Sequence, residues 1–118
     1  FEIYNNEFKN NSKLISPPFN SELKIGSFHV YPLRIANINE TQRDTIIQKM
    51  ADNGISVNVH FIPLVMHPAY TKLGYNINDF PNTYSMYQNE ISLPVYSKLS
   101  RDDALYISKT LINIVDQI

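Results

Sequence analysis

The sequence predicts an α/β domain of the α+β type, built on a small sheet of about three strands. Residues typical of strands gather in three stretches, at 28–35, 55–61 and 91–96. Two stretches with apolar residues at helical spacing, at 40–53 and 100–118, predict the main helices. A chain of 118 residues fits one domain and can bury roughly two thirds of its unfolded surface.

The composition excludes several classes of protein. With 43% hydrophobic and 18% charged residues, the chain is globular in composition and not disordered. Its formal net charge of −1 gives no reason to expect nucleic acid or an anionic membrane as a partner. No apolar run approaches the ~18 residues of a transmembrane helix, and no signal peptide is visible. The absence of cysteine excludes disulfides, thiolate metal sites and cysteine nucleophiles.

The first part of the chain predicts a helix, a loop and a strand. Residues 1–10 read as the last turns of a helix, because two aromatic residues stand four positions apart and the first residue is Phe1, not Met. Residues 16–21 hold two consecutive prolines and predict a loop. In the strand at 28–35, Pro32 offers no N–H donor, which predicts an edge position or a bulge.

The helix at 40–53 carries signals at both ends. Asn39 is a suitable N-cap, and Gln42 stands three residues later in the capping-box position. Gly54 follows the last turn, where a glycine commonly ends a helix. The face expected to be buried consists of Ile46, Ile47, Met50 and Ala51.

The stretch at 55–61 predicts the central strand. The helix before it makes either a right-handed parallel crossover or an antiparallel return, and the sequence leaves both open. Pro63 ends the ladder, so the strand delivers His60 and Phe61 to its own end, where binding groups are often placed. The apolar side chains expected on its buried face are Ile55, Val57, Val59 and Phe61.

The second half predicts two short helices, a strand and a long helix. Residues 68–73 and 81–90 each have a proline in the first turn, and 91–96 reads as a short or edge strand. Ser100 caps the last helix, whose acidic first turn suits the helix dipole. The expected buried residues are Tyr84, Tyr87 and Ile91 in the first stripe, and Ala104, Ile107, Leu111, Val115 and Ile118 in the second.

The residues alone predict a candidate binding loop at 60–70 but no reaction. His60 is either a solvent-facing histidine or a donor to a polar ligand, and both interpretations stay open, whereas His67 fits a solvent-facing position better. No metal site is expected, because the histidines lack a third ligand at short range. Arg34 is either a partner for a carboxylate or phosphate or a surface residue, and both interpretations stay open. Three glycines are too few for a phosphate-binding loop, and no Ser-His-Asp spacing is present.

Four ordered motifs resemble the C-terminal part of the DegT-type sugar aminotransferases, which are pyridoxal-phosphate enzymes that aminate keto nucleotide sugars. The motifs are GISVNVHFIPL at 54–64, PAYTKLGY at 68–75, DFPN at 79–82 and EISLPVY at 90–96. The stretch FHVYPLR fits the strand that precedes them in the family, and the resemblance runs over 27–118. Four motifs with matching gaps are far more specific than any one of them.

The resemblance implies a place in a larger fold. It matches only the small C-terminal domain of an aspartate-aminotransferase-type fold, with a small mixed or antiparallel sheet and helices packed on one face. Residues 1–26 are then the end of a helix and a linker from a missing large domain, and 27–118 form the small domain. The lysine that carries the cofactor lies in the large domain of the family. This chain alone is therefore expected to hold no pyridoxal phosphate and to be inactive, with no catalytic, cofactor-binding or metal-binding residues.

The same resemblance identifies the substrate-contacting segment as His60, Phe61, Ile62, Pro63 and Leu64. A histidine at a strand end and nearby backbone amides can bond sugar hydroxyls or phosphate, while Phe61 and Pro63 supply an apolar wall. Val65 and Met66 stand between this segment and His67. This spacing departs from the commonest family pattern and leaves the role of His67 open.

The full-length enzyme is expected to bind pyridoxal phosphate and to transfer an amino group from glutamate to a keto nucleotide sugar. It is expected to be a cytoplasmic homodimer with no nucleic-acid or membrane partner. The alternative is a non-catalytic carbohydrate-binding or nucleotide-binding module, or a structural module, of the same fold. The two differ in whether a lysine-bearing large domain accompanies the chain.

Overall fold

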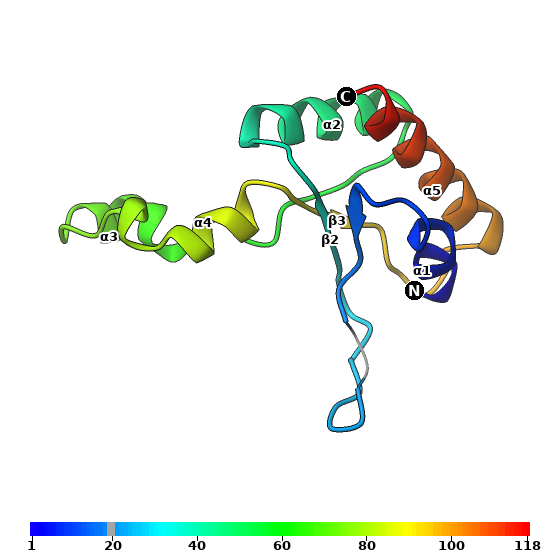
Figure 1. The fold of residues 1–118 in the computed structure, drawn as a ribbon, viewed down its shortest axis with the longest axis horizontal. Coiled ribbons are helices and arrows are strands. Elements are labelled where there is room, and N and C mark those ends of the chain that lie inside the picture. Colours follow the sequence, from blue (N-terminus) through cyan, green and yellow to red (C-terminus); the bar gives the residue numbers. More distant parts are fainter. Residues whose placement is uncertain (19–20) are drawn as a thin grey trace.

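In the computed structural model, which describes residues 1–18 and 21–118, a three-stranded sheet joins the helices (Figure 1). The strands are β1 (Leu14–Ile15), β2 (Tyr31–Ile35) and β3 (Glu90–Leu93), in the spatial order β1-β2-β3. Both pairs are antiparallel. The predicted fold class, a small sheet of about three strands with helices, is confirmed.

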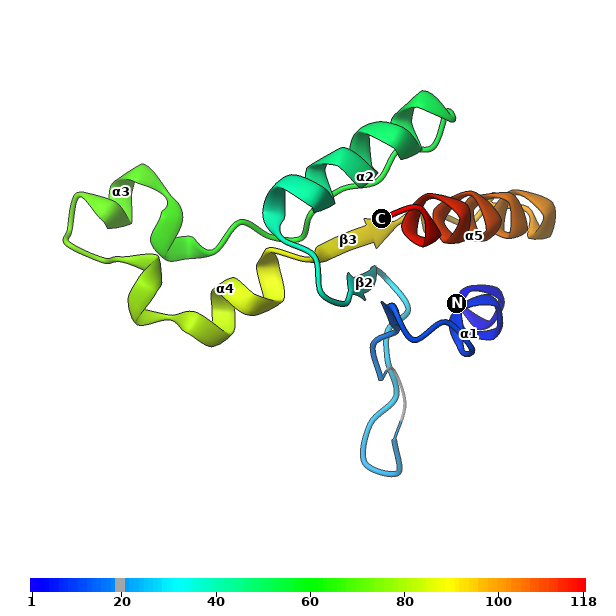
Figure 2. The same ribbon diagram turned by 45° about the horizontal axis from the view of Figure 1, so that its top comes forward.

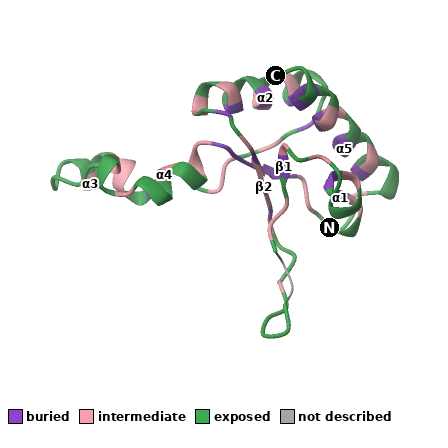
Figure 3. Cartoon of the chain, in the orientation of Figure 1, coloured by how far each residue is buried: buried purple, intermediate pink, exposed green. Residues whose placement is uncertain are grey.

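One face of the sheet is covered by three helices, α1 (Glu2–Phe8), α2 (Glu40–Asp52) and α5 (Arg101–Asp116). Helix α5 lies between α1 and α2, as Figures 1 and 2 show. Alternate residues of β2 are buried, as expected for a strand with one face on a core. The buried residues, purple in Figure 3, form one core that includes Tyr4, Phe8, Tyr31, Leu33, Ile46, Leu111 and Val115.

Pro32 lies in the central strand, although the sequence predicted an edge or a bulge. The Ile35 N–H donates to the Asn89 carbonyl next to β3 at 2.9 Å. Because N–H groups alternate along a strand, the nitrogen of Pro32 faces the other side, toward β1. Strand β1 pairs only with Ile35 and Arg34 among the described residues. A donor is therefore not needed at Pro32, and the sheet tolerates the proline.

The predicted central strand at 55–61 is wrong. The segment is extended, but in the described part of the chain it joins the sheet through one isolated antiparallel bridge between Asn58 and Ser92. Ile55 is buried as predicted, whereas Phe61 is 77% exposed. The third strand is instead β1, whose two residues are too few to produce an alternating pattern that sequence reasoning could detect.

The pairing ends early because a side chain replaces the backbone partner. The His60 N–H donates to the Glu90 carboxylate at 3.0 Å and not to a backbone carbonyl. The bridge at Asn58 also decides the direction left open by the sequence. Both this segment and β2 run antiparallel to β3, so they run parallel to each other with β3 between them. The connection through α2 is therefore the parallel crossover, one of the two alternatives that the sequence left open. Strand β3 lies between the two segments that it connects.

The ends of α2 agree with the sequence. The Asn39 side chain accepts from the Gln42 N–H at 2.9 Å, and the Asn39 N–H donates to the Gln42 side chain at 3.0 Å. Gly54 has a φ of +73°, the left-handed conformation that favours glycine after a helix. The predicted buried face was partly wrong, because Ala51 is exposed and the charged Arg43 is buried.

Residues 64–87 form an arm that extends away from the sheet (Figures 1 and 2). It contains two 3₁₀ turns, η1 (Leu64–Met66) and η2 (Ile77–Asp79), and two helices, α3 (Pro68–Thr71) and α4 (Pro81–Tyr87). Both helices begin with a proline, as predicted. Gly74, the residue after the helix predicted at 68–73, has a φ of +91°.

The buried stripe predicted for the second of these helices is wrong. No residue of α4 is buried, and the hydroxyls of Tyr84 and Tyr87 donate to the Glu40 carboxylate at 3.2 and 2.9 Å. Ile91 is buried, but it belongs to β3. In α5 the predicted cap and stripe are present, except that the last member, Ile118, is 42% exposed.

The predicted loop at 16–21 falls partly outside the described residues, which omit 19–20. Residues 16–18 have no helix or strand, and Ser21 forms an isolated bridge with Lys24. Helix α1 confirms the helix expected in the first ten residues. Within the described ranges, no helix is both long and apolar enough to span a bilayer.

Candidate functional site

A cleft of about 510 Å³ lies on the face of the sheet opposite the helical core. Its volume is in the range of small-molecule sites. The side chains of β2 that face away from the core, Pro32 and Arg34, form part of it. The remaining lining comes from β1 and the prolines after it, the segment after Asn58, α4 and the start of β3: Ile15, Ser16, Pro17, Pro18, His60, Phe61, Pro63, Thr83, Met86, Tyr87 and Glu90.

Three of the five residues predicted to contact substrate line this cleft. They are His60, Phe61 and Pro63. The other two, Ile62 and Leu64, are not among the lining residues and are 50% and 58% exposed. The structure therefore brings part of the predicted segment to the cleft and turns alternate residues outward.

His60 is half-buried at the edge of the cleft. Its ring meets the Phe61 ring edge to face, with centroids 4.8 Å apart. Its Nδ1 is buried and has no hydrogen-bond partner among the described residues. A buried polar atom without a partner costs free energy. The His60 imidazole therefore retains the capacity for one further hydrogen bond beside the cleft.

Glu90 is the buried carboxylate of the cleft, and sequence reasoning did not single it out. It is 6% exposed, and its Oε1 accepts from the Ser92 hydroxyl at 2.6 Å. Burial raises the pKa of the Glu90 carboxyl, and the hydrogen bonds from Ser92 and His60 partly oppose the rise. The signal that could have identified Glu90 is its position as a charged residue at the start of β3, a strand whose other residues are all buried.

Arg34 supplies the one guanidinium among the lining residues. The residue is half-buried, and its Nε donates to the Asn89 side chain at 3.2 Å. This bond holds the base of the guanidinium, and within residues 1–18 and 21–118 its terminal nitrogens have no hydrogen-bond partner, so they are available for an acceptor. The structure thus places Arg34 at the cleft, where the sequence left an anion-binding and a surface interpretation open.

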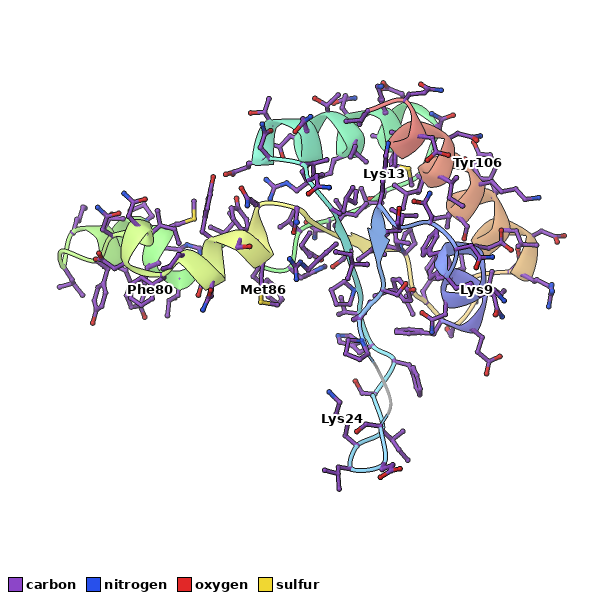
Figure 4. All side chains as sticks on the ribbon, viewed as in Figure 1. Lys9, Lys13, Lys24, Phe80, Met86 and Tyr106 are labelled. Atoms are coloured by element: carbon purple, nitrogen blue, oxygen red, sulfur yellow. The ribbon has the colours of Figure 1, made fainter. Side chains whose placement is uncertain are left out.

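The wall of the cleft from α4 is fixed to the start of α2. Arg43, which is 3% exposed, donates to the Tyr87 carbonyl at 3.0 Å, and its guanidinium lies 4.7 Å from the centre of the Tyr87 ring. Arg43 also pairs with Asp44 and Glu40 at 2.8 and 3.4 Å. Burial raises the pKa of the Tyr87 hydroxyl, so it stays protonated and donates to Glu40. Met86, labelled in Figure 4, lies on the same helix.

No lysine lines the cleft in the described part of the chain. In Figure 4, Lys9 and Lys13 lie on the side of the helices, and Lys24 lies at the far end of the loop that precedes β2. The lining therefore contains hydrogen-bonding groups and apolar surface, but no amine that could form a Schiff base. Among residues 1–18 and 21–118, no group of three or more histidine, aspartate or glutamate side chains is placed to hold a metal ion.

Comparison with protein families gives a match over nearly the whole chain. The model of the DegT/DnrJ/EryC1/StrS aminotransferase family matches residues 1–112. An uncharacterised protein of Methanocaldococcus jannaschii, MJ1066, is 40% identical over 119 residues. That alignment covers 98% of this chain and 30% of the relative.

Relatives that are named for an activity are also similar. The Campylobacter jejuni UDP-4-amino-4,6-dideoxy-N-acetyl-beta-L-altrosamine transaminase is 27% identical over 121 residues, which is 98% of this chain and 30% of that protein. The solved structure of the putative sugar aminotransferase Spr1654 from Streptococcus pneumoniae, in its PLP form, is similar with a TM-score of 0.94 and 32% identity. It is covered over 29% of its length, against 98% of this chain. The chain therefore spans about 30% of the length of these relatives.

Proposed function

The chain belongs to the DegT/DnrJ/EryC1/StrS aminotransferase family, and we propose that it is the C-terminal small domain of an enzyme that transfers an amino group from glutamate to a keto nucleotide sugar. The observation that carries the proposal is the position of His60, Phe61 and Pro63 on a cleft of small-molecule size, in a chain similar to a UDP-sugar transaminase. The role of this domain is to bind and enclose the sugar nucleotide.

In this proposal residues 1–26 are the end of a helix and a linker that follow a large domain, and 27–118 are the small domain. Relatives more than three times as long support a further domain, since the chain covers 30% of them. Tyr4 and Phe8 of the first helix pack in the core, with the Tyr4 hydroxyl donating to the Pro94 carbonyl at 2.9 Å. The first helix would thus be held against the small domain by these two side chains.

The cofactor of the full-length enzyme is pyridoxal phosphate, which when bound carries the amino group between donor and acceptor. A PLP form among the similar structures supports this assignment. The residues of this chain do not fit the covalent role, because the cleft has no lysine among the described residues. The chain alone is therefore expected to hold no cofactor and to be inactive, and the aldimine lysine is assigned to the large domain.

The segment His60 to Leu64 is proposed to contact the sugar nucleotide. His60 can bond a sugar hydroxyl, while Phe61 and Pro63 present apolar surface to the sugar ring or base. The exposed side chains of Ile62 and Leu64 would meet parts of the enzyme or ligand beyond this chain. The full-length enzyme is proposed to be a cytoplasmic homodimer without nucleic-acid or membrane partners.

The experiment that tests this function uses the full-length protein encoded with this chain. After addition of pyridoxal phosphate, we expect the absorbance of an internal aldimine, and transfer of the amino group of glutamate to a keto nucleotide sugar. Removing the cofactor should abolish transfer, and adding it back should restore it. A full-length product without the aldimine absorbance would contradict the enzyme assignment and favour a non-catalytic binding or structural module.

A further inference from the structure

The pairing beside β3 is interrupted at one pair of residues. Asn58 and Ser92 exchange two backbone hydrogen bonds, of 3.2 and 2.7 Å. Hydrogen-bonded pairs of an antiparallel ladder recur at every second residue, so His60 and Glu90 would be the next pair. Instead, the His60 N–H donates to Oε2 of the Glu90 side chain at 3.0 Å. A carboxylate stands where a backbone carbonyl would accept.

The Glu90 carboxylate is itself held at a fixed point. Its other oxygen, Oε1, accepts from the Ser92 hydroxyl at 2.6 Å. The strand that carries it is buried along its whole length, with Ile91 fully inside the core. A side chain bonded through both oxygens on such a strand has few alternative positions. It presents an acceptor to the next segment with little freedom to move.

The consequence is a change in the course of the chain after Asn58. Continued backbone pairing would lay the following residues along β3. Pairing through a side chain separates His60 from the β3 backbone, and the chain then leaves the sheet with Phe61 and Pro63 at the cleft. The position of the His60 imidazole therefore depends on the acceptor that holds its backbone N–H.

We propose that Glu90 is a positioning residue of the sugar-nucleotide site, whose carboxylate sets the backbone of His60 and thereby the wall of the cleft from His60 to Pro63. This inference rests on the proposed function. Glu90 acts through His60 and needs no contact with substrate.

The chemistry at this position favours a functional role over a purely structural one. A buried carboxylate loses hydration, and an apolar residue of similar volume would fill the same space without that loss. Burial raises the pKa of the Glu90 carboxyl, so its hydrogen bonds from His60 and Ser92 do not fully compensate for the hydration that the charged form loses. Groups that a fold retains at a cost in stability are frequent at functional sites.

The test compares three substitutions in the full-length, cofactor-loaded protein. Glu90→Leu removes both acceptors at similar volume, Glu90→Gln keeps one oxygen for the His60 N–H, and Glu90→Asp keeps the charge but is shorter by one methylene. We expect Glu90→Leu and Glu90→Asp to raise the KM for the keto nucleotide sugar about tenfold, with kcat changed less than about threefold. Glu90→Gln should have a KM within about threefold of the wild-type value.

A second readout does not depend on activity. Hydrogen–deuterium exchange of a peptide covering 58–64 should be faster in Glu90→Leu and near the wild-type rate in Glu90→Gln, because only the latter retains an acceptor for the His60 N–H. The control is Ile107→Val, a core change in α5 that lowers stability while keeping Glu90 and its two hydrogen-bond partners, His60 and Ser92. It should leave both KM and the exchange of this peptide unchanged.

The outcomes separate this inference from the function on which it rests. A wild-type protein that transfers no amino group would remove the proposed function and this inference together. An active wild type with unchanged KM and exchange in Glu90→Leu and Glu90→Asp would overturn the role of Glu90 alone. The role of Glu90 would also be overturned if Ile107→Val reproduced the changes in KM and exchange, since general destabilisation would then explain them. Should Glu90→Leu fail to fold, Glu90→Asp and Glu90→Gln still decide the matter.

Discussion

At the scale of single residues, two buried charges organise the cleft. Glu90 holds the segment that carries His60, and Arg43 holds the helix that carries Tyr87. Each charge reaches a backbone group far away in sequence, and each side chain is almost fully buried. Buried charges of this kind are stable only when their partners are in place, so both positions should respond strongly to substitution.

The pKa of Glu90 predicts a pH dependence of stability. Its folded-state pKa lies above the ordinary value of 4.5, so the folded protein binds the proton more tightly than the unfolded chain does. The stability contributed by this group is therefore present below that value and is lost as the pH rises through the raised pKa. Glu90→Gln cannot lose a proton. The unfolding free energy of the variant minus that of the wild type should increase through this window and then level off.

Urea unfolding of both proteins from about pH 4 to about pH 8 measures this difference. A difference that decreases as the pH rises would mean that the carboxylate is favoured in the fold, contrary to its burial.

Arg43 provides a second prediction at this scale. Arg43→Ala leaves the Tyr87 carbonyl and the Glu40 carboxylate without their guanidinium donor and opens space in the core. We expect a loss of about 2 kcal/mol in unfolding free energy, measured as a lower urea midpoint at constant m. The matched control is Arg101→Ala, an exposed arginine that should change the value by less than about 0.5 kcal/mol. Equal effects of the two substitutions would contradict the account.

At the scale of elements, the helices followed from local signals. The capping box at Asn39, the glycine stops and the proline starts each act within a few residues, so the sequence was sufficient to predict them. Strands β2 and β3 overlap the predicted stretches at 28–35 and 91–96, but the third strand did not follow in the same way. The stretch at 55–61 alternates well, but whether it pairs depends on Glu90, which is thirty residues away. Strand β1 is so short that only its partner defines it.

The cap of α2 can be tested directly. Asn39→Ala removes the acceptor for the Gln42 N–H and should cost about 1 kcal/mol of stability. Asn39→Asp keeps an acceptor and should stay within about 0.5 kcal/mol of the wild type. Thermal unfolding of the three proteins compares them. An alanine variant as stable as the aspartate variant would show that the cap contributes nothing to the fold.

At the scale of the whole molecule, the cleft is assembled from parts that the sequence places far apart. The family resemblance pointed to the segment from His60 to Leu64, and three of its residues, His60, Phe61 and Pro63, line the cleft. Sequence reasoning could not locate Glu90 or assign Arg34 to the cleft, because their positions depend on the register between β2 and β3. The stripe expected on α4 failed for a related reason. Its tyrosines pair with Glu40 of another helix and do not enter the core.

The segment after Asn58 is proposed to form part of a sugar-nucleotide site, so substitutions in it should change the affinity of the full-length enzyme for its keto nucleotide sugar. His60→Ala should weaken this affinity about tenfold, the loss of one well-placed hydrogen bond, and should leave the cofactor absorbance intact. His29→Ala, an exposed histidine outside the cleft, serves as the control and should change neither quantity. Unchanged affinity in His60→Ala would contradict the claim.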